Sequence, residues 1–234
     1  PEPDVIADEV ERMLRGGSPL TGKRVLVTAG ATREPVDPVR FISNYSSGRM
    51  GVAVARAAWE RGAQVTLVAG SIDVPLPTGA HVIHVRTTEE MSVAVSEAIT
   101  TADVLIMAAA PADFRPAEAA TSKIKKSLSP SAIPLVPTTD ILAATIEGRP
   151  ESLVVIGFAL ETDNLIENAR AKLSAKKLDM IVANRAGPEG EGFGSDTNRV
   201  TFISSGGSEE LPLISKSEVA ELLLDRVEGM LNGR

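Results

Sequence analysis

Short apolar runs alternate with amphipathic segments along the chain, and this alternation predicts its secondary structure. Residues 23–30 (KRVLVTAG) form a β-branched run that ends in glycine, which is typical of a buried parallel strand. Residues 50–63 then place Val52, Ala55 and Trp59 on one face of a helix. A second strand pattern follows at residues 64–70, so the three segments predict a βαβ unit.

The same alternation continues to the end of the chain. Two helices are predicted to begin with capping boxes, Thr87 with Glu90 and Ser215 with Glu218. The predicted helices occupy residues 87–102, 139–148, 164–178 and 215–231. The predicted strands occupy residues 81–87, 103–110, 153–162, 179–186, 199–205 and 210–214. Strands that alternate with helices indicate an α/β fold with a doubly wound, mostly parallel, Rossmann-like sheet.

The domain organisation is predicted to be simple, because the chain shows no internal repeat and no break in composition. Residues 1–18 read as a short acidic helix followed by a Gly-Gly-Ser joint. The first residue is Pro1 rather than methionine, so we expect the chain to be cut from a longer protein. Residues 1–18 are then a linker remnant, and residues 19–234 form one domain.

Composition excludes several classes of protein. The 234 residues carry a formal net charge of -7 and only 3% aromatic residues, which argues against a nucleic-acid backbone or an anionic membrane as the main partner. The absence of cysteine excludes disulfides and thiolate chemistry, and His81 and His84 make a poor metal set. No apolar run approaches the roughly 18 residues of a membrane span, and the start lacks signal-peptide features. We therefore expect a cytoplasmic enzyme.

The loop after the first strand is the first candidate site. It is much longer than the roughly 2 to 6 residues usual for a βα connection. Its end, SSGRMG, places Ser46, Ser47 and Gly48 where a helix begins, and free backbone N–H groups there favour a phosphate. The alternative is an ordinary cap, in which Ser46 or Ser47 bonds only its own helix. The length of the loop, and the polar Arg33, Arg40 and Asn44 in it, favour the anion site.

A dinucleotide site is the obvious competitor. Residues 28–37 (TAGATREPVD) lack the third glycine of the G-x-G-x-x-G fingerprint. The second strand ends in LVAGSIDV, which offers no acidic residue at the expected place for a ribose diol. NAD is therefore disfavoured as a ligand, although the glycine pattern alone is weak evidence either way.

Residues 111–137 read as a long functional flap, because they contain several prolines and no sustained period. Lys123, Lys125 and Lys126 lie close together in it. They either belong to a solvated surface loop or supply positive charge to a bound polyphosphate. A second basic set, Lys172, Lys176 and Lys177, lies on the helix before residues 179–186, with the same two interpretations. Asp113 follows a buried strand and is a candidate for Mg²⁺ or for a base, although turn aspartates are often structural.

Several long motifs in a fixed order resemble one family. They are GATREPVDPVRFISNYSSGRMG at residues 30–51, AAAPADFRP at 108–116 followed by KIKK at 123–126, GFALET at 157–162, and the KxxxKxxDMIVAN pattern at 172–184. Together they resemble phosphopantothenoylcysteine synthetase, over residues 20 to about 231. In many bacteria this enzyme is the C-terminal half of a bifunctional protein of coenzyme A biosynthesis that also carries a decarboxylase domain.

The resemblance implies a two-step ligation. The carboxylate of 4'-phosphopantothenate attacks the α-phosphorus of CTP, which releases pyrophosphate and forms an acyl-cytidylate. The amine of L-cysteine then displaces CMP and forms an amide. The resemblance implies Mg²⁺ and a homodimer supported by the last strands and helix. The composition predicts no nucleic-acid and no membrane partner.

The resemblance also implies roles for individual residues. The catalytic residues would be Asn44 at the acyl carbonyl, Arg40 in support of the same step, and Lys123 in formation of the acyl-cytidylate. Asp113 and Phe114 match the cytosine and cation region, with Asp113 as the metal ligand. The CTP-binding residues would be Gly30, Ser46, Ser47, Gly48, Ala109, Ala110, Ala112, Asp113, Phe114, Phe158, Lys172, Lys176 and Asn184.

Two other functions remain open from the residues alone. One is a nicotinamide- or flavin-dependent oxidoreductase on a similar sheet, against which the missing fingerprint counts. The other is a nucleotide-sensing or scaffolding module that binds CTP without transferring anything. Tyr45 and Arg49 depart from the residues frequent in relatives; Arg49 either adds charge beside a phosphate or faces solvent. The glycine-rich loop at 187–198 matches the family without an assigned role.

Overall fold

The computed structural model describes residues 3, 6, 9, 10, 12, 17–126, 132–161, 163–185 and 194–233. The helix predicted at residues 1–18 and the first part of the glycine-rich loop, residues 187–193, therefore lie largely or wholly outside the described residues.

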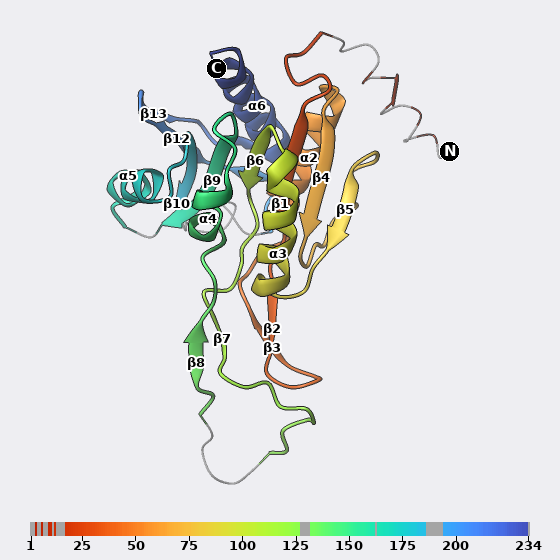
Figure 1. Cartoon of the computed structure of the whole chain (residues 1–234), viewed down its shortest axis with the longest axis vertical. Helices are drawn as coiled ribbons and strands as arrows, with labels where there is room; N and C mark the ends of the chain where they lie inside the picture. The colour runs from red at the N-terminus through yellow and green to blue at the C-terminus, as the bar shows by residue number, and fades with distance from the viewer. Residues whose placement is uncertain are drawn as a thin grey trace.

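Eight strands of the described chain form one central sheet in the order β13-β12-β10-β9-β6-β1-β4-β5 (Figure 1). The six parallel strands are β1 (Arg24–Ala29), β4 (Gln64–Ala69), β5 (His81–His84), β6 (Val104–Met107), β9 (Val154–Glu161) and β10 (Met180–Arg185). The strands β12 (Val200–Ser204) and β13 (Gly207–Glu210) add antiparallel neighbours. Counted along the chain, the parallel strands lie in the order 3-2-1-4-5-6 of a Rossmann sheet, which confirms the predicted fold class.

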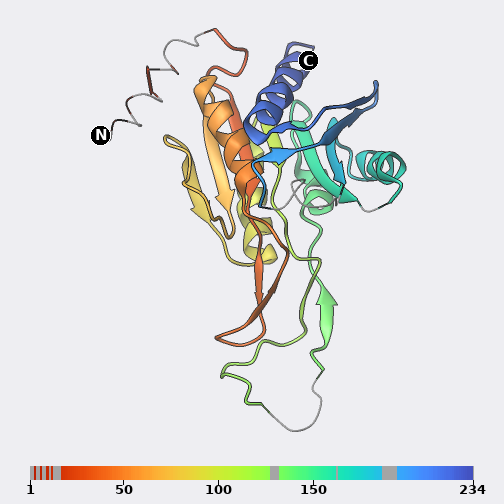
Figure 2. The same cartoon turned by 180° about the vertical axis from the view of Figure 1, so that it is seen from behind.

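Helices cover both faces of the sheet. The helices α2 (Arg49–Glu60) and α6 (Lys216–Asn232) pack on one face, as Figure 2 shows, and α3 (Thr88–Ala98), α4 (Ile141–Ala144) and α5 (Leu165–Ala175) pack on the other. The sheet has one apolar core on each face, and successive residues of β1 point into them alternately. Val25 and Val27 belong to the core with α2 and α6, whereas Leu26 belongs to the core with α3. The predicted apolar face of α2, with Val52, Ala55 and Trp59, is buried. Both predicted capping boxes form.

An ion-pair cluster fastens α2 to α6 in addition to their apolar contact. The guanidinium of Arg61, at the end of α2, lies 2.6 Å from Glu221, 2.8 Å from Asp225 and 3.0 Å from Glu228. Burial alone would lower the pKa of Arg61, but these carboxylates outweigh it and raise that pKa. The cluster links the two helices, whose N-terminal residues Arg49 and Lys216 both line the same cavity.

Two antiparallel ribbons project beyond this edge and form what we call the arm (Figure 1). One ribbon lies within the long first loop and pairs β2 (Arg33–Pro35) with β3 (Phe41–Ser43). The other lies within the predicted flap and pairs β7 (Phe114–Pro116) with β8 (Leu135–Pro137). The ribbons are joined where the N–H of Ala120 donates to the carbonyl of Val36 at 2.9 Å. The predicted flap therefore contains regular structure, because β7 and β8 pair where it leaves the sheet.

The helix predicted at residues 139–148 is wrong in its extent. Helix α4 ends at Ala144, and only a 3-10 turn, η2 (Ile146–Gly148), follows. The carbonyl of Leu142, which would accept the next helical bond, instead accepts from the side chains of Thr145 and Arg149. Competition of this kind by side chains ends short helices. A similar 3-10 turn, η1 (Ile99–Thr101), finishes α3.

The strand predicted at residues 210–214 is also wrong. The second strand of that hairpin is the more polar β13, in which Glu210 pairs with Thr201. The N–H of Leu211 still donates to Val200, but Pro212 has no N–H, so the ladder ends there. A short pair of β11 (Thr197–Asn198) with β14 (Ile214–Ser215) brings the chain to the start of α6.

Candidate active site

The candidate site lies at the carboxyl edge of the sheet, where the strand order reverses between β1 and β6. Ligands of doubly wound sheets bind in this crevice. The loop after β1 bridges both neighbours there, because Ala31 pairs with Ser71 on one side and with Ala110 on the other. Gly30 makes this crossing possible: its φ is +80°, and a Cβ would lie 2.3 Å from the carbonyl oxygen of Ser71.

A cavity of about 140 Å³, which we call the basic cavity, opens at this point. It is lined by the start of α2, the loop after β6, the end of β9 and the start of α6. The lining residues are Ser46, Ser47, Gly48, Arg49, Met50, Ala108, Ala109, Ala110, Phe158, Ala159, Leu160, Asn184, Asn198 and Lys216. Seven of the predicted CTP-binding residues are among them: Ser46, Ser47, Gly48, Ala109, Ala110, Phe158 and Asn184.

The N-terminus of α2 has no side-chain cap. Gly48 is the N-cap residue, with φ +76°, and neither serine closes the helix. Ser46 Oγ instead accepts a long bond, 3.3 Å, from the N–H of Gly48. The alternative in which Ser46 or Ser47 serves as an ordinary cap is therefore wrong. The first N–H groups of α2 remain available to an acceptor in the cavity, and the helix dipole favours an anion there.

Two cations occupy the first positions of two helices that meet at the basic cavity. Arg49 begins α2 and Lys216 begins α6, where the positive ends of the helix dipoles disfavour cations. Arg49 Nη1 lies 2.5 Å from Asp196 Oδ1, and Arg49 Nε is buried without a hydrogen-bond partner among the described residues. Lys216 is only 8% exposed and donates to the carbonyl of Ser195 at 2.6 Å. Burial, followed by the charge of Arg49, lowers the pKa of Lys216, and Asp196 opposes this shift.

A neighbouring cavity of about 240 Å³ shares Ala109 and Phe158 with the basic cavity. Ala112, Asp113 and Lys176 of the predicted set also line it. Lys176 Nζ lies 3.0 Å from Asp140 Oδ2. Burial alone would raise the pKa of Asp140, but the bond from Lys176 and the N–H of Ala143 outweigh it and lower that pKa. This cavity therefore combines apolar side chains with a fixed ion pair, two threonines and the carboxylate of Asp113.

A buried polar network holds the loops around the two cavities. Glu34 of β2 accepts the N–H of Thr88 at 2.8 Å and its hydroxyl at 2.9 Å. Thr32 Oγ1 accepts the N–H of Ala112 at 2.9 Å, and Thr138 Oγ1 donates to the carbonyl of Ala112 at 2.5 Å. Thr88 Oγ1 also lies 3.3 Å from the carbonyl oxygen of Ala112. Three segments of the sequence, those of Thr32, Thr88 and Thr138, thus converge on Ala112, directly before Asp113.

The three predicted catalytic residues lie on or beside the arm. Asn44 follows β3, and its Nδ2 donates to the carbonyl of Pro111 at 2.8 Å. Arg40 precedes β3, pairs with Asp37 at 3.2 Å and donates to the carbonyl of Ile124. Lys123 is exposed and directly precedes Ile124. The structure therefore gathers these residues on one substructure, without placing any of them in the lining of either cavity.

Three other predicted CTP-binding residues also lie outside these two linings. Gly30 lies in the crossing of the first loop, and Phe114 is exposed on β7. Lys172 lies in the last turn of α5, where its Nζ is 2.6 Å from Glu161 Oε1. Their predicted roles in nucleotide binding stay predictions.

Sequence reasoning missed Lys216, Asn198 and Asp196 and left Arg49 undecided. One signal was present: a basic residue directly after the capping Ser215 is electrostatically unfavourable at a helix start. The pairing of Arg49 with Asp196 spans 147 positions, which no local pattern reveals.

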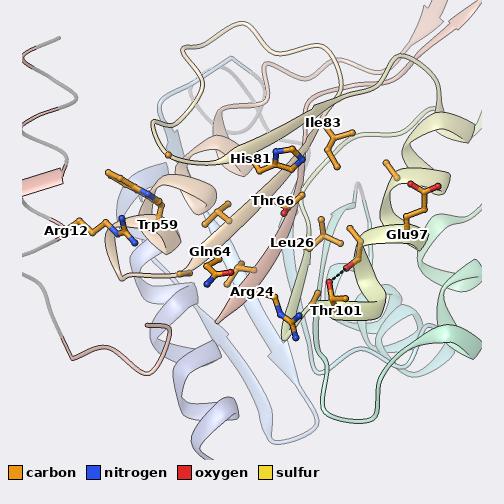
Figure 3. Close-up of a pocket in the computed structure, with 17 residues that line it drawn as sticks. Arg12, Arg24, Leu26, Trp59, Gln64, Thr66, His81, Ile83, Glu97 and Thr101 are labelled. Carbon is orange, nitrogen blue, oxygen red and sulfur yellow. Dashed lines mark hydrogen bonds between the residues drawn. The ribbon is translucent and has the colours of Figure 1, made fainter. Parts of the chain in front are cut away.

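The largest of these cavities, about 640 Å³, lies at the opposite end of the sheet (Figure 3). Arg24, Gln64 and His81 line it from the starts of β1, β4 and β5, and Trp59 and Arg12 close one side. The Arg12 guanidinium lies 5.2 Å from the centre of the Trp59 ring. Because the crevice of a doubly wound sheet lies at the other edge, this cavity is separate from the candidate site.

The described residues contain no group of three or more Asp, Glu or His side chains that could hold a metal ion by themselves. Mg²⁺ is commonly bound by one or two carboxylates together with substrate phosphates, and Asp113, exposed beside the neighbouring cavity, fits that kind of site. In the described part of the chain, no helix is both long and apolar enough to cross a membrane.

Comparison with known proteins identifies the family. Residues 20–230 match the model described as the DNA/pantothenate metabolism flavoprotein C-terminal domain. The chain belongs to this family. The family match agrees with the range over which the motifs resemble phosphopantothenoylcysteine synthetase, and that predicted resemblance is confirmed.

Similar family members include the coenzyme A biosynthesis bifunctional protein CoaBC of Mycobacterium tuberculosis, 45% identical over 92% of this chain and 54% of that protein. A cysteine/cysteine sulfinic acid decarboxylase of an unknown prokaryotic organism is 47% identical over 89% of this chain and 59% of that protein. The chain thus spans little more than half the length of these relatives.

Solved structures resemble the chain as well. The C-terminal domain of CoaBC has a TM-score of 0.79 and 40% identity, and covers 93% of this chain and 100% of that one. A mutant of Cab2 in complex with phosphopantothenate-cysteine has a TM-score of 0.75 at 16% identity, over 98% of this chain and 92% of that one. Because the sequence identity to Cab2 is only 16%, that similarity shows a shared fold and nothing more.

Proposed function

We propose that this chain is a phosphopantothenate-cysteine ligase, which joins 4'-phosphopantothenate to L-cysteine with CTP in coenzyme A biosynthesis. The observation that carries the proposal is the pair of adjoining cavities at the switch point of the sheet. The basic cavity offers two helix N-termini, Arg49 and Lys216 to a triphosphate. The neighbouring cavity shares Phe158 with it and offers both apolar side chains and polar groups to a base. The names of the CoaBC relatives agree with this assignment.

The reaction needs charge neutralisation first and an oriented acyl group second. In the first step a carboxylate oxygen of phosphopantothenate bonds to the α-phosphorus of CTP, and the bond to pyrophosphate breaks. Lys123 would neutralise the charge of this step, and Asp113 would hold Mg²⁺, which supplies further charge neutralisation when it is bound.

In the second step the amine of cysteine bonds to the acyl carbon, CMP leaves, and the amine gives up a proton. Asn44 Nδ2 carries two N–H groups. One is used on the carbonyl of Pro111, and the other would donate to the acyl carbonyl while Arg40 supports the same step. None of this chemistry requires a protein thiol, and the chain has none.

Pyrophosphate release tests the proposal. CTP with Mg²⁺ and phosphopantothenate should release pyrophosphate, added cysteine should give the amide and CMP, and ATP should support much less of either. Absence of pyrophosphate with every nucleotide would remove the ligase assignment. CTP binding without pyrophosphate would favour a nucleotide-sensing module, and a thermal shift with NADPH would favour an oxidoreductase.

The proposed partners follow from the same assignment. They are the three substrates, a second copy of the chain in a homodimer, and a decarboxylase domain in the same polypeptide, as in a bifunctional relative. A cytoplasmic location is part of the proposal. The decarboxylase name of one relative refers to a protein of which this chain spans 59%, so it assigns no activity to this part.

A further inference from the structure

The buried carboxylate of Asp37 connects the two ribbons of the arm. Asp37 lies in the turn between β2 and β3 and is 2% exposed. Its Oδ1 accepts the N–H groups of Val39 at 2.8 Å and Arg40 at 2.9 Å, which closes its own turn. Its Oδ2 accepts the N–H of Ile124, in the flap, at 3.1 Å and lies 3.2 Å from Arg40 Nη2.

These contacts fix the backbone of Ile124 on both sides. Asp37 accepts its N–H, and Arg40 Nη2 donates to its carbonyl at 2.5 Å. A buried carboxylate costs free energy unless hydrogen bonds compensate its charge. Burial would raise the pKa of Asp37, but the N–H groups of Val39, Ile124 and Arg40 outweigh it and lower that pKa. If the flap left the hairpin, the ionised carboxylate would lose one of these donors.

We propose that Asp37 is a positioning residue that sets where Lys123 lies, by holding the backbone of the next residue, Ile124, against the hairpin turn. The contact itself is independent of the activity, whereas its importance for catalysis rests on the proposed function. Asp37 touches no substrate in this role; it acts through the flap.

Hydrogen exchange of the full chain tests the contact. Asp37→Asn replaces Oδ2 by an N–H donor, while Oδ1 remains to accept from Val39 and Arg40. The amide of Ile124 should then exchange roughly tenfold faster or more, and the amides of Val39 and Arg40 should change little. Unchanged exchange at Ile124, or an equal increase at all three amides, would overturn the proposal.

The matched control is Asp103→Asn. Asp103 Oδ2 also accepts a backbone N–H, that of Arg24 at 2.8 Å, and lies 3.7 Å from its Nε, at the other end of the sheet. This variant should leave Ile124 exchange unchanged. A second variant, Ile124→Pro, deletes the donor from the flap and leaves Asp37 intact, so it should give the same kinetic defect even if Asp37→Asn fails to fold.

Kinetics then test the consequence for Lys123. Asp37→Asn should slow pyrophosphate release in the absence of cysteine roughly tenfold or more. It should slow the reaction of cysteine with supplied acyl-cytidylate less, because only its contact with Arg40 bears on that step. In a Lys123→Met background, Asp37→Asn should slow pyrophosphate release no further. A full additional loss in that background would overturn the positioning role. If the unmodified chain released no pyrophosphate, the ligase assignment would fail, and the exchange result would still decide the contact.

Discussion

Asn44 connects two loops of the candidate site through a single side-chain bond to Pro111. Asn44→Ala removes that bond and the proposed donor to the acyl carbonyl. We expect overall turnover to fall by about 10² to 10³-fold, the effect typical of losing one such donor, with CTP binding nearly unchanged and the acyl-cytidylate accumulating. Quenched reactions analysed by mass spectrometry would measure the intermediate. Tyr45→Phe, at a residue 87% exposed, is the control and should behave normally. Normal turnover of Asn44→Ala would disprove the assigned role.

Lys216 is the cation of the basic cavity that sequence reasoning did not identify. Lys216→Met keeps the length of the side chain and removes its charge, so CTP should bind roughly tenfold or more weakly. The free energy of unfolding should change by less than about 1 kcal/mol, because the lost bond to Ser195 is offset by removal of a buried charge beside Arg49. Calorimetry and denaturant unfolding measure the two quantities. Arg226→Met, at an exposed pair with Glu209, is the control for loss of a surface cation.

The lowered pKa of Lys216 gives this prediction a pH dependence. The protonated form attracts phosphate, so CTP affinity should fall as pH rises through that lowered pKa, and this part of the fall should be absent in Lys216→Met. The free energy of unfolding should depend on pH in the opposite direction, because burial disfavours the charged form of Lys216 in the folded protein. The contribution of Lys216 to stability falls as pH decreases from the ordinary lysine pKa through the lowered one. An equal pH dependence of CTP binding in both proteins would exclude Lys216 as its source.

At the scale of elements, the start of α2 depends on a backbone conformation that favours glycine. Gly48 has φ +76°, and a Cβ there would lie 2.8 Å from Ile72 Cγ1. Gly48→Ala should therefore destabilise the protein by about 1–2 kcal/mol for the left-handed conformation and more for the contact, and weaken CTP binding. Gly229→Ala, in α6 where a Cβ meets open space, should instead stabilise by about 0.5–1 kcal/mol. Urea unfolding of both variants checks the opposite signs; equal signs would contradict this account.

Local patterns were sufficient to predict most elements and insufficient for the site. The capping residues Thr87 and Ser215 and the apolar face of α2 are encoded within one or two helical turns, so the sequence predicts them correctly. Helix α4 ends early because Arg149 takes the carbonyl of Leu142. The strand β13 lies at the sheet edge, where polar residues are tolerated, so an apolar-pattern search misplaced it.

The site departs further from prediction because it is assembled from distant segments. The pair of Arg49 and Asp196 and the contact of Asp37 with Ile124 join residues far apart in sequence. Lys172 and Lys176 belong to one helical pattern, yet they point to different partners. Lys176 pairs with Asp140 and lines the neighbouring cavity, whereas Lys172 pairs with Glu161 and lies outside the linings of both site cavities. Motifs could therefore predict which loops meet at the candidate site, and the fold was needed to tell which side chains lie together there.

At the scale of the whole molecule, the arm carries a concentration of exposed apolar side chains. Six of its large apolar side chains are exposed: Val39, Phe41, Phe114, Ile124, Ile133 and Leu135. Two-stranded ribbons are marginally stable alone, and exposed apolar side chains on them favour contact with a partner. The arm is therefore a second candidate for the surface of the proposed homodimer, beside the C-terminal strands and helix predicted from the resemblance.

Two matched substitutions separate these surfaces. Leu135 on the arm and Leu213 before β14 are 49% and 44% exposed, so a glutamate at either should cost the folded monomer little. If the arm forms the dimer, Leu135→Glu should convert it to monomer at micromolar concentration, because a charge would be buried without a partner, while Leu213→Glu stays dimeric. Sedimentation equilibrium measures the mass of each. If Leu213→Glu is the monomer and Leu135→Glu the dimer, the contact lies at the C-terminal strands. If the unsubstituted chain is itself a monomer, the proposed homodimer is wrong.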